Sequence, residues 1–209
     1  MKTIHFIRHA ESQANAGQAT FDNKTIALTE KGKQQAEALV SKIGEKPDLI
    51  ICSKFMRTQQ TAAPLSNKFP QTPVKILPLH EFTYLSPATC AGTTVYRRQT
   101  WACDYWDACS PIFTHGEGAE SFIQFTERID QSLQCLEMCE YNNIAVFTHG
   151  HVLRAIWQQL SGHQFSSDEE RMHHFYHHMS LLPVPNACIF KATFENNQWQ
   201  IIDPQPLLI

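Results

Sequence analysis

Two short segments, far apart in the chain, each place a histidine after a run of apolar residues and before small ones. They are Ile4–Ala10 (IHFIRHA) and Ile144–Gly150 (IAVFTHG). A strand that ends in polar residues and then turns into a helix is how α/β proteins present reactive groups. In a parallel sheet the carboxyl ends of the strands share one edge, where helix N-termini attract anions. The two segments are therefore expected to contribute to one anion-binding pocket.

The rest of the chain alternates apolar runs with amphipathic stretches, which is typical of a sheet covered on both faces. Strands are expected over 2–7, 48–52, 74–77 and 144–147, with a closing hairpin over 188–194 and 199–202. A first helix is expected from the N-cap Thr29 to the terminator Gly44. Others are expected after residues 53–58 and through about Phe69, over 119–140, and after His149. The pattern predicts an α/β fold, a three-layer sandwich with a mainly parallel central sheet and helices on both faces.

Residues 83–118 show neither a helical nor a strand periodicity and are rich in aromatic residues, cysteine, proline and threonine. A stretch of that length without a regular pattern, inside a compact domain, is usually functional. We therefore expect a single domain over 1–209, in which residues 83–118 form a partly helical cap over the site.

The composition argues against several classes of function. With 209 residues, 43% hydrophobic and 18% charged, the chain resembles a globular protein that buries a core. A net charge of −3 without a basic run argues against a nucleic-acid partner, and no apolar run reaches membrane-spanning length. Seven cysteines without a C-x-x-C motif or signal peptide predict free thiols and a cytoplasmic location. The oligomeric state, a homodimer included, is left open.

Five polar residues follow the expected strands: Arg8, His9, Arg57, Glu81 and His149. Their types suit phosphoryl transfer without a metal or another cofactor. A neutral imidazole is a good nucleophile toward phosphorus, and guanidinium groups neutralise the phosphoryl oxygens. A carboxylic acid protonates the leaving oxygen and then, as a carboxylate, activates water. The sequence thus predicts an enzyme that acts on a small phosphorylated metabolite.

Six motifs, in order along the chain, resemble those of the histidine phosphatase superfamily, in its phosphoglycerate mutase-like branch. They are Arg8-His9-Ala10-Glu11-Ser12 with Asn15, Leu28-Thr29-x-x-Gly32-x-x-Gln35-Ala36, Ser53-x-x-x-Arg57-Thr58-x-x-Thr61-Ala62, Leu79-His80-Glu81-Phe82, Gly118-Ala119-Glu120-Ser121 and Thr148-His149-Gly150. The resemblance extends from Lys2 to about Leu160. One departure is Ala10, where the family usually has glycine; its Cβ would matter most if the backbone needed a positive φ.

The resemblance implies roles for particular residues of these motifs. His9 would be the phosphorylated nucleophile and Glu81 the proton donor. Contacts to the phosphoryl group would come from Arg8, Arg57 and His149. Further substrate contacts would come from Ser12, Asn15 and the backbone at Gly150.

The leading interpretation is a metal-independent phosphatase that works through a phosphohistidine, and three others stay open. The nearest is a phosphoglycerate mutase-type transfer. A second is a non-catalytic module that binds phosphorylated ligands. The third is a metallohydrolase based on residues 173–178, whose histidines have the i, i+4 spacing that zinc sites use. Because this cluster lacks a clear third ligand, an exposed polar helix is favoured there, and no metal is expected.

Two arginines and two further acids are near the expected site in the sequence. The family's mutases carry a longer basic segment after the acid, where this chain offers Arg97 and Arg98. We expect these arginines to contact the part of the substrate beyond the phosphoryl group. Glu117 and Glu120 are the alternatives to Glu81 as proton donor.

Overall fold

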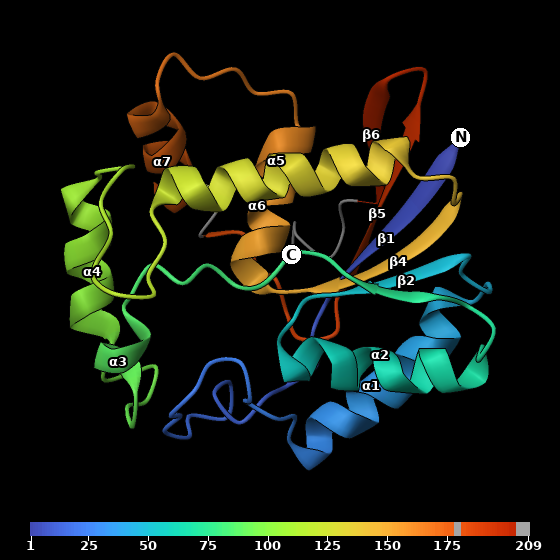
Figure 1. Ribbon diagram of the computed structural model, residues 1–209, viewed down its shortest axis with the longest axis horizontal. Coiled ribbons are helices and arrows are strands. Elements are labelled where there is room, and N and C mark those ends of the chain that lie inside the picture. Colours follow the sequence, from blue (N-terminus) through green and yellow to red (C-terminus); the bar gives the residue numbers. More distant parts are fainter. Residues whose placement is uncertain (178–180, 204–209) are drawn as a thin grey trace.

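A six-stranded sheet forms the centre of the molecule (Figure 1), in a computed structural model that describes residues 1–177 and 181–203. Its strand order is β3-β2-β4-β1-β5-β6. The strands are β1 (Lys2–Arg8), β2 (Leu49–Cys52), β3 (Val74–Ile76), β4 (Asn143–Thr148), β5 (Ile189–Glu195) and β6 (Gln198–Asp203). Strands β1 to β4 run parallel, whereas β5 and β6 are antiparallel to their neighbours. The predicted mainly parallel sheet, with β1 at its centre, is confirmed.

Helices cover both faces of this sheet (Figure 1). On one face lie α1 (Glu30–Ile43) and α2 (Met56–Lys68). On the other lie α5 (Phe122–Met138) and α6 (Gly150–Leu160), with α7 (Asp168–His177) beside them. Two further helices, α3 (Pro87–Cys90) and α4 (Gln99–Ala108), stand beyond the carboxyl ends of the strands. The three-layer sandwich predicted from the sequence is confirmed.

Local chemistry explains where these elements begin and end. Thr29 caps α1 by accepting a hydrogen bond from the Gly32 amide, and Gly44 ends the helix at φ 75°. Ser121 and Gln124 form a reciprocal capping box at the start of α5. The β5–β6 hairpin turns at two asparagines in the left-handed region, Asn196 and Asn197.

Alternate residues of the strands enter two separate hydrophobic cores. Ile4 and Phe6 of β1 pack in the core beneath α5 and α6. Ile7 belongs to the core beneath α1 and α2, together with Ala145 and Phe147 of β4. Because both faces are buried, the central strands read as continuous apolar runs, which is why their positions were visible in the sequence.

The 83–118 segment is partly helical, as expected, and its aromatic residues join the core of the α5–α6 face. Tyr105 and Trp106 of α4 are buried there. Trp106 stacks on Tyr176 of α7 with the ring centroids 5.1 Å apart, and it also lies 5.7 Å from Phe175. The aromatic content that gave no clear period in the sequence therefore anchors α4 to α7.

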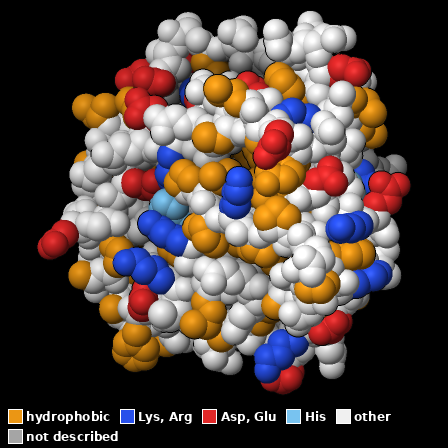
Figure 2. All heavy atoms as spheres, turned by 45° about the vertical axis from the view of Figure 1, so that its right-hand side comes forward, with side chains coloured by type: hydrophobic (Ala, Val, Ile, Leu, Met, Phe, Trp, Pro, Cys, Tyr) orange, Lys and Arg blue, Asp and Glu red, His pale blue; other side chains and the backbone are white. Residues whose placement is uncertain are grey.

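The surface and the thiols agree with the composition. All seven cysteines are free. None of the helices in the described part of the chain is long and apolar enough to cross a membrane. On the face shown in Figure 2, lysine and arginine side chains are scattered among acidic and apolar ones.

Buried histidines make the free energy of unfolding of this fold depend on pH. His5 of β1 is only 5% exposed, and its Nδ1 has no hydrogen-bond partner among the described residues. Burial, assisted by Lys191, lowers the pKa of His5 to about 4. The unfolded chain therefore binds a proton at this residue below about pH 6.5, whereas the folded protein binds it only near pH 4.

We predict that the free energy of unfolding falls as the pH is lowered from about 6.5 to 4. His5→Leu should reduce this slope by removing a contribution of at most about 3 kcal/mol, since one pKa unit is worth about 1.4 kcal/mol. Part of the slope should remain, because burial also lowers the pKa of His80, to about 3. Urea unfolding at several pH values measures this; equal slopes in parent and variant would contradict it.

Candidate active site

The parallel pairing of β1 with β4 brings the two histidine segments together. Arg8 lies opposite Thr148 in the register, so the residues that follow, His9 and His149, emerge side by side. Their ring centroids are 5.1 Å apart, in an edge-on arrangement. The expectation that these two histidines meet at the carboxyl edge is met by the geometry.

His9 is held in one tautomer. Its Nδ1 lies 2.7 Å from the Ala10 carbonyl oxygen, which only accepts hydrogen bonds, so Nδ1 carries the proton. The other ring nitrogen, Nε2, accepts a hydrogen bond from Arg57 Nε at 3.2 Å. Burial and the charges of Arg57 and Arg8 lower the pKa of His9 well below its usual value. The ring is therefore neutral, with its lone pair on Nε2.

His149 is fully buried at the N-cap of α6 and is bonded to a chain of hydroxyl groups. Its Nε2 lies 2.8 Å from Ser53 Oγ, which lies 3.0 Å from Thr58 Oγ1. The Thr58 hydroxyl donates to the Phe55 carbonyl at 2.8 Å. Thr58 then accepts from Ser53, and Ser53 from His149 Nε2. This leaves His149 Nδ1, which is buried and without a partner among the described residues, as the nitrogen available to a ligand.

Two arginines, the buried Arg57 and the half-buried Arg8, supply positive charge. Arg57, in the first turn of α2, donates to the Asn23 carbonyl at 2.7 Å and lies over the Phe55 ring. Arg8 donates to the Val184 carbonyl, and its Nε has no partner within the described chain. Burial lowers the pKa of both side chains, that of Arg57 to about 10, so both stay charged at neutral pH.

Glu81 is the carboxylate of the site. Its Oε1 accepts hydrogen bonds from the backbone amides of Phe82, at 3.1 Å, and His151, at 3.0 Å. Burial alone would raise the pKa of Glu81, but His151, His149 and Arg57 together lower it well below its usual value. In the absence of a ligand, these neighbours favour the ionised form of Glu81 over the protonated form.

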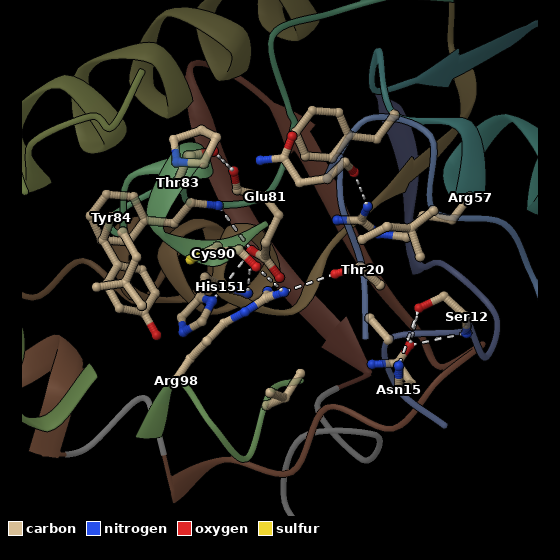
Figure 3. A pocket seen from close by; sticks show the side chains of 18 of the residues that line it. Ser12, Asn15, Thr20, Arg57, Glu81, Thr83, Tyr84, Cys90, Arg98 and His151 are labelled. Carbon is tan, nitrogen blue, oxygen red and sulfur yellow. Dashed lines mark hydrogen bonds and ion pairs between the residues drawn. The ribbon is translucent and has the colours of Figure 1, made fainter. Parts of the chain in front are cut away.

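Arg8, His9, Arg57 and Glu81 line a cavity of about 470 Å³ (Figure 3), which opens between the loop after β1 and the 83–118 segment. The fully buried His149 packs against His9 and is not part of this lining. Its walls are largely apolar and aromatic, and include Phe21, Phe55, Phe82, Tyr84, Leu85 and Val95. Phe21 is 79% exposed at the cavity. The arrangement places two cations and a neutral imidazole at the base of a cavity with flat apolar walls.

Ser12 and Asn15 both line the cavity and also bind each other. The Asn15 side-chain oxygen accepts from the Ser12 amide at 3.1 Å, from Ser12 Oγ at 2.9 Å and from Asn186 at 3.1 Å. With that oxygen occupied, the amide nitrogen of Asn15 is the group it offers to a ligand. Gly150 opens α6 behind Glu81, where its missing Cβ would lie 3.7 Å from Glu81 Oε2.

The two arginines of the 83–118 segment differ from each other. Arg98 lines the cavity, but it donates to Thr93 Oγ1, Thr20 Oγ1 and the carbonyls of Cys90 and Thr93, at 2.7–3.0 Å (Figure 3). It thereby ties this segment to the loop after β1. Arg97 is exposed and does not line the cavity. A contact between Arg98 and substrate stays a prediction; the position of Arg97 gives no support for one.

The alternative acids lie elsewhere. Glu120 forms an ion pair with Arg128 at 2.6 Å and accepts from the Thr83 amide at 2.9 Å, while Glu117 is exposed. Neither lines the cavity. On α7, the rings of His173 and His177 lie 4.2 Å apart; His178 lies outside the described residues. Within the described ranges, no group of three or more metal-ligating side chains is found.

Close packing fixes the loop that carries His9. A Cβ on Gly32 would lie 2.0 Å from the Glu11 carbonyl oxygen, so only glycine lets α1 dock against this loop. Ala10, the departure noted above, is fully buried and is not among the residues with positive φ. Its methyl group therefore fits the core without backbone strain.

The sequence did not assign a role to two residues that the structure brings to the site. His151 lines the cavity, and its Nδ1 lies 3.4 Å from Glu81 Oε1. Asn186, from the loop before β5, donates to the His9 carbonyl at 3.0 Å and to Asn15. A histidine directly after His149-Gly150 was a usable signal, whereas the position of Asn186 depends on long-range folding.

Comparisons with known proteins agree with this geometry. The family model of the histidine phosphatase superfamily (branch 1) matches residues 4–204. The adenosylcobalamin/alpha-ribazole phosphatase of Escherichia coli (strain K12) is 33% identical over 180 residues, covering 82% of this chain and 83% of the relative. That of Salmonella typhi is 29% identical over 209 residues, covering 96% and 89%.

A solved structure shares the fold. The alpha-ribazole phosphatase from Shigella flexneri superimposes with a TM-score of 0.73 and is 24% identical, covering 96% of this chain and 94% of that one. At that identity the likeness concerns the fold alone.

Proposed function

Since the chain belongs to the histidine phosphatase superfamily and is a phosphatase like its relatives, we propose that it works through a covalent phosphohistidine on His9. The state of the His9 ring carries this proposal. The ring is neutral, its Nδ1–H is bonded to Ala10, and its lone pair is on Nε2 at the floor of the cavity. A neutral imidazole is nucleophilic toward phosphorus, whereas an imidazolium is not.

In the first half-reaction, His9 Nε2 attacks the phosphorus atom and the bond to the leaving oxygen breaks. Arg57 Nε, which donates to His9 Nε2 at 3.2 Å in the empty site, must donate to a phosphoryl oxygen instead. Arg8 Nε, which has no partner among the described residues, is free to donate to a second phosphoryl oxygen. These cations neutralise the charge that spreads over the phosphoryl oxygens. Burial strengthens this effect because water is excluded.

His149 is proposed to bind the phosphoryl group through Nδ1. Burial, Arg57 and His9 lower its pKa in the empty site. A phosphate dianion reverses this balance, because a negative charge nearby favours the imidazolium. His149 would then donate from both nitrogens, to Ser53 and to the phosphoryl group.

Glu81 is proposed to give its proton to the leaving oxygen. In the second half-reaction its carboxylate takes a proton from water, and the resulting hydroxide attacks phosphorus and releases His9. The proton lost in the first step is thereby regained in the second. The position of Glu81 in the cavity lining, unlike those of Glu117 and Glu120, supports this assignment.

The substrate is proposed to be a small phosphate monoester whose alcohol part carries a flat apolar ring. The aromatic walls of the cavity suit such a group, and aromatic pairs add attraction beyond burial of area. Relatives named adenosylcobalamin/alpha-ribazole phosphatases make alpha-ribazole 5′-phosphate the first ester to test. Hydrolysis is favoured over mutase-type transfer, since Arg98, the cation beside these walls, is already bonded to Thr93, Thr20 and Cys90.

We predict that the protein releases inorganic phosphate from alpha-ribazole 5′-phosphate, in the presence of a chelator, with a higher kcat/KM than from glycerol phosphate. His9→Ala should lower kcat at least about 10³-fold, because it removes the nucleophile. His163→Gln, at a histidine outside the cavity lining, is the matched control. Near-parental turnover by His9→Ala would reject the mechanism.

Glu81→Gln should lower turnover of alkyl phosphates roughly 10²–10⁴-fold, the range typical of general acid catalysis. An alkoxide needs a proton as its bond to phosphorus breaks. With p-nitrophenyl phosphate the loss should be much smaller, because p-nitrophenolate leaves without a proton. Steady-state kinetics on both esters measures the difference; equal losses would place the acid elsewhere.

A further inference from the structure

We propose that His151 and Glu81 share one proton and act as a pair, in which His151 holds the proton that Glu81 delivers to the leaving group. The inference rests on the proposed function and deepens it. His151 acts through Glu81, so it is a positioning residue for that proton.

The geometry of the pair carries the inference. His151 Nδ1 lies 3.4 Å from Glu81 Oε1, and the backbone amide of His151 donates to the same oxygen at 3.0 Å. Nδ1 is buried and has no hydrogen-bond partner among the described residues, whereas the side chain as a whole is 27% exposed. The imidazole therefore reaches the carboxylate at one end and the cavity at the other (Figure 3).

Packing holds the imidazole in this position. Its ring stacks on Trp106 of α4 and Phe175 of α7, with centroids 6.3 and 6.1 Å away. Tyr84 faces it edge-on at 5.9 Å, and burial raises the pKa of that phenol to about 12, so Tyr84 stays neutral. Of the titratable groups that face the imidazole, Glu81 is thus the one that exchanges a proton with it.

Glu81 needs such a partner because its surroundings oppose its own protonation. Arg57 and His149 face the carboxylate, and Arg8 lies on the same floor of the cavity. A carboxylate beside two arginines loses its proton well below neutral pH, yet the leaving oxygen requires a proton. His151 Nδ1, 3.4 Å from Glu81 Oε1, is placed to hold that proton. The pair therefore enters the reaction carrying one proton.

Substrate binding moves that proton within the pair. A phosphate dianion beside Glu81 repels the carboxylate and raises its affinity for the proton, which passes from His151 to Glu81. Glu81 then gives it to the leaving oxygen as the bond to phosphorus breaks. The attacking water later returns a proton to Glu81, and release of phosphate lets it pass back to His151. Each turnover thus ends with the pair again holding one proton.

The test is the pH dependence of kcat/KM for an alkyl phosphate and for p-nitrophenyl phosphate. His151→Asn keeps a side-chain N–H near the position of Nδ1 but cannot titrate, and His151→Ala removes both properties. A pair that holds one proton loses it at a higher pH than the carboxylate alone. In both variants the alkaline fall in the alkyl phosphate profile should move to lower pH by about one unit or more, while the p-nitrophenyl phosphate profile stays in place.

His173→Asn, at an exposed histidine of α7, should keep the parental profile. An alkaline fall at the same pH in the parent and His151→Asn would overturn the inference, because His151 would then act only as a hydrogen-bond donor. Loss of activity through His9→Ala tests the proposed function separately. A parent that hydrolyses neither ester would reject that function and this inference together.

Discussion

The parallel register between β1 and β4 is the constraint on which the site depends. It pairs Arg8 with Thr148, so the next residue of each strand is a histidine, and both rings emerge at the same edge. A shift of one residue would exchange the faces of the strand and put core residues where the rings belong. The two hydrophobic cores, which take alternate strand residues, hold this register. The same register therefore packs the core and places the reactive groups.

Charge is the second organising feature. Arg57 is buried and Arg8 is half-buried beside Glu81, the carboxylate of the cavity lining, and His9 and His149 are both kept neutral. Burying unpaired cations costs free energy, which backbone carbonyls such as those of Asn23 and Val184 partly offset. A phosphoryl group supplies the missing negative charge. The same field that stabilises the bound phosphate keeps His9 in its nucleophilic form.

Much of this could be predicted from the sequence because local patterns determine it. The apolar strands, the cap at Thr29 and the polar residues after each strand all follow from neighbours in the chain. The rest could not be predicted, since it depends on contacts between distant residues. Arg98 looked like a substrate contact, but its partner Thr20 is 78 residues away; the pairing of His151 with Glu81 spans 70 residues. Asn186 reaches His9 from an even more distant loop.

Everything proposed for the site requires that His9 Nε2 becomes covalently phosphorylated during turnover. The most direct measurement is to quench the reaction of labelled substrate, separate the protein under alkaline conditions, and locate the phosphoryl group by peptide mass spectrometry. We expect a label on His9 that is stable in base and lost in acid, as is typical of a phosphoramidate. An acid-stable label on a hydroxyl group such as that of Ser53, or a label on His149, would contradict it.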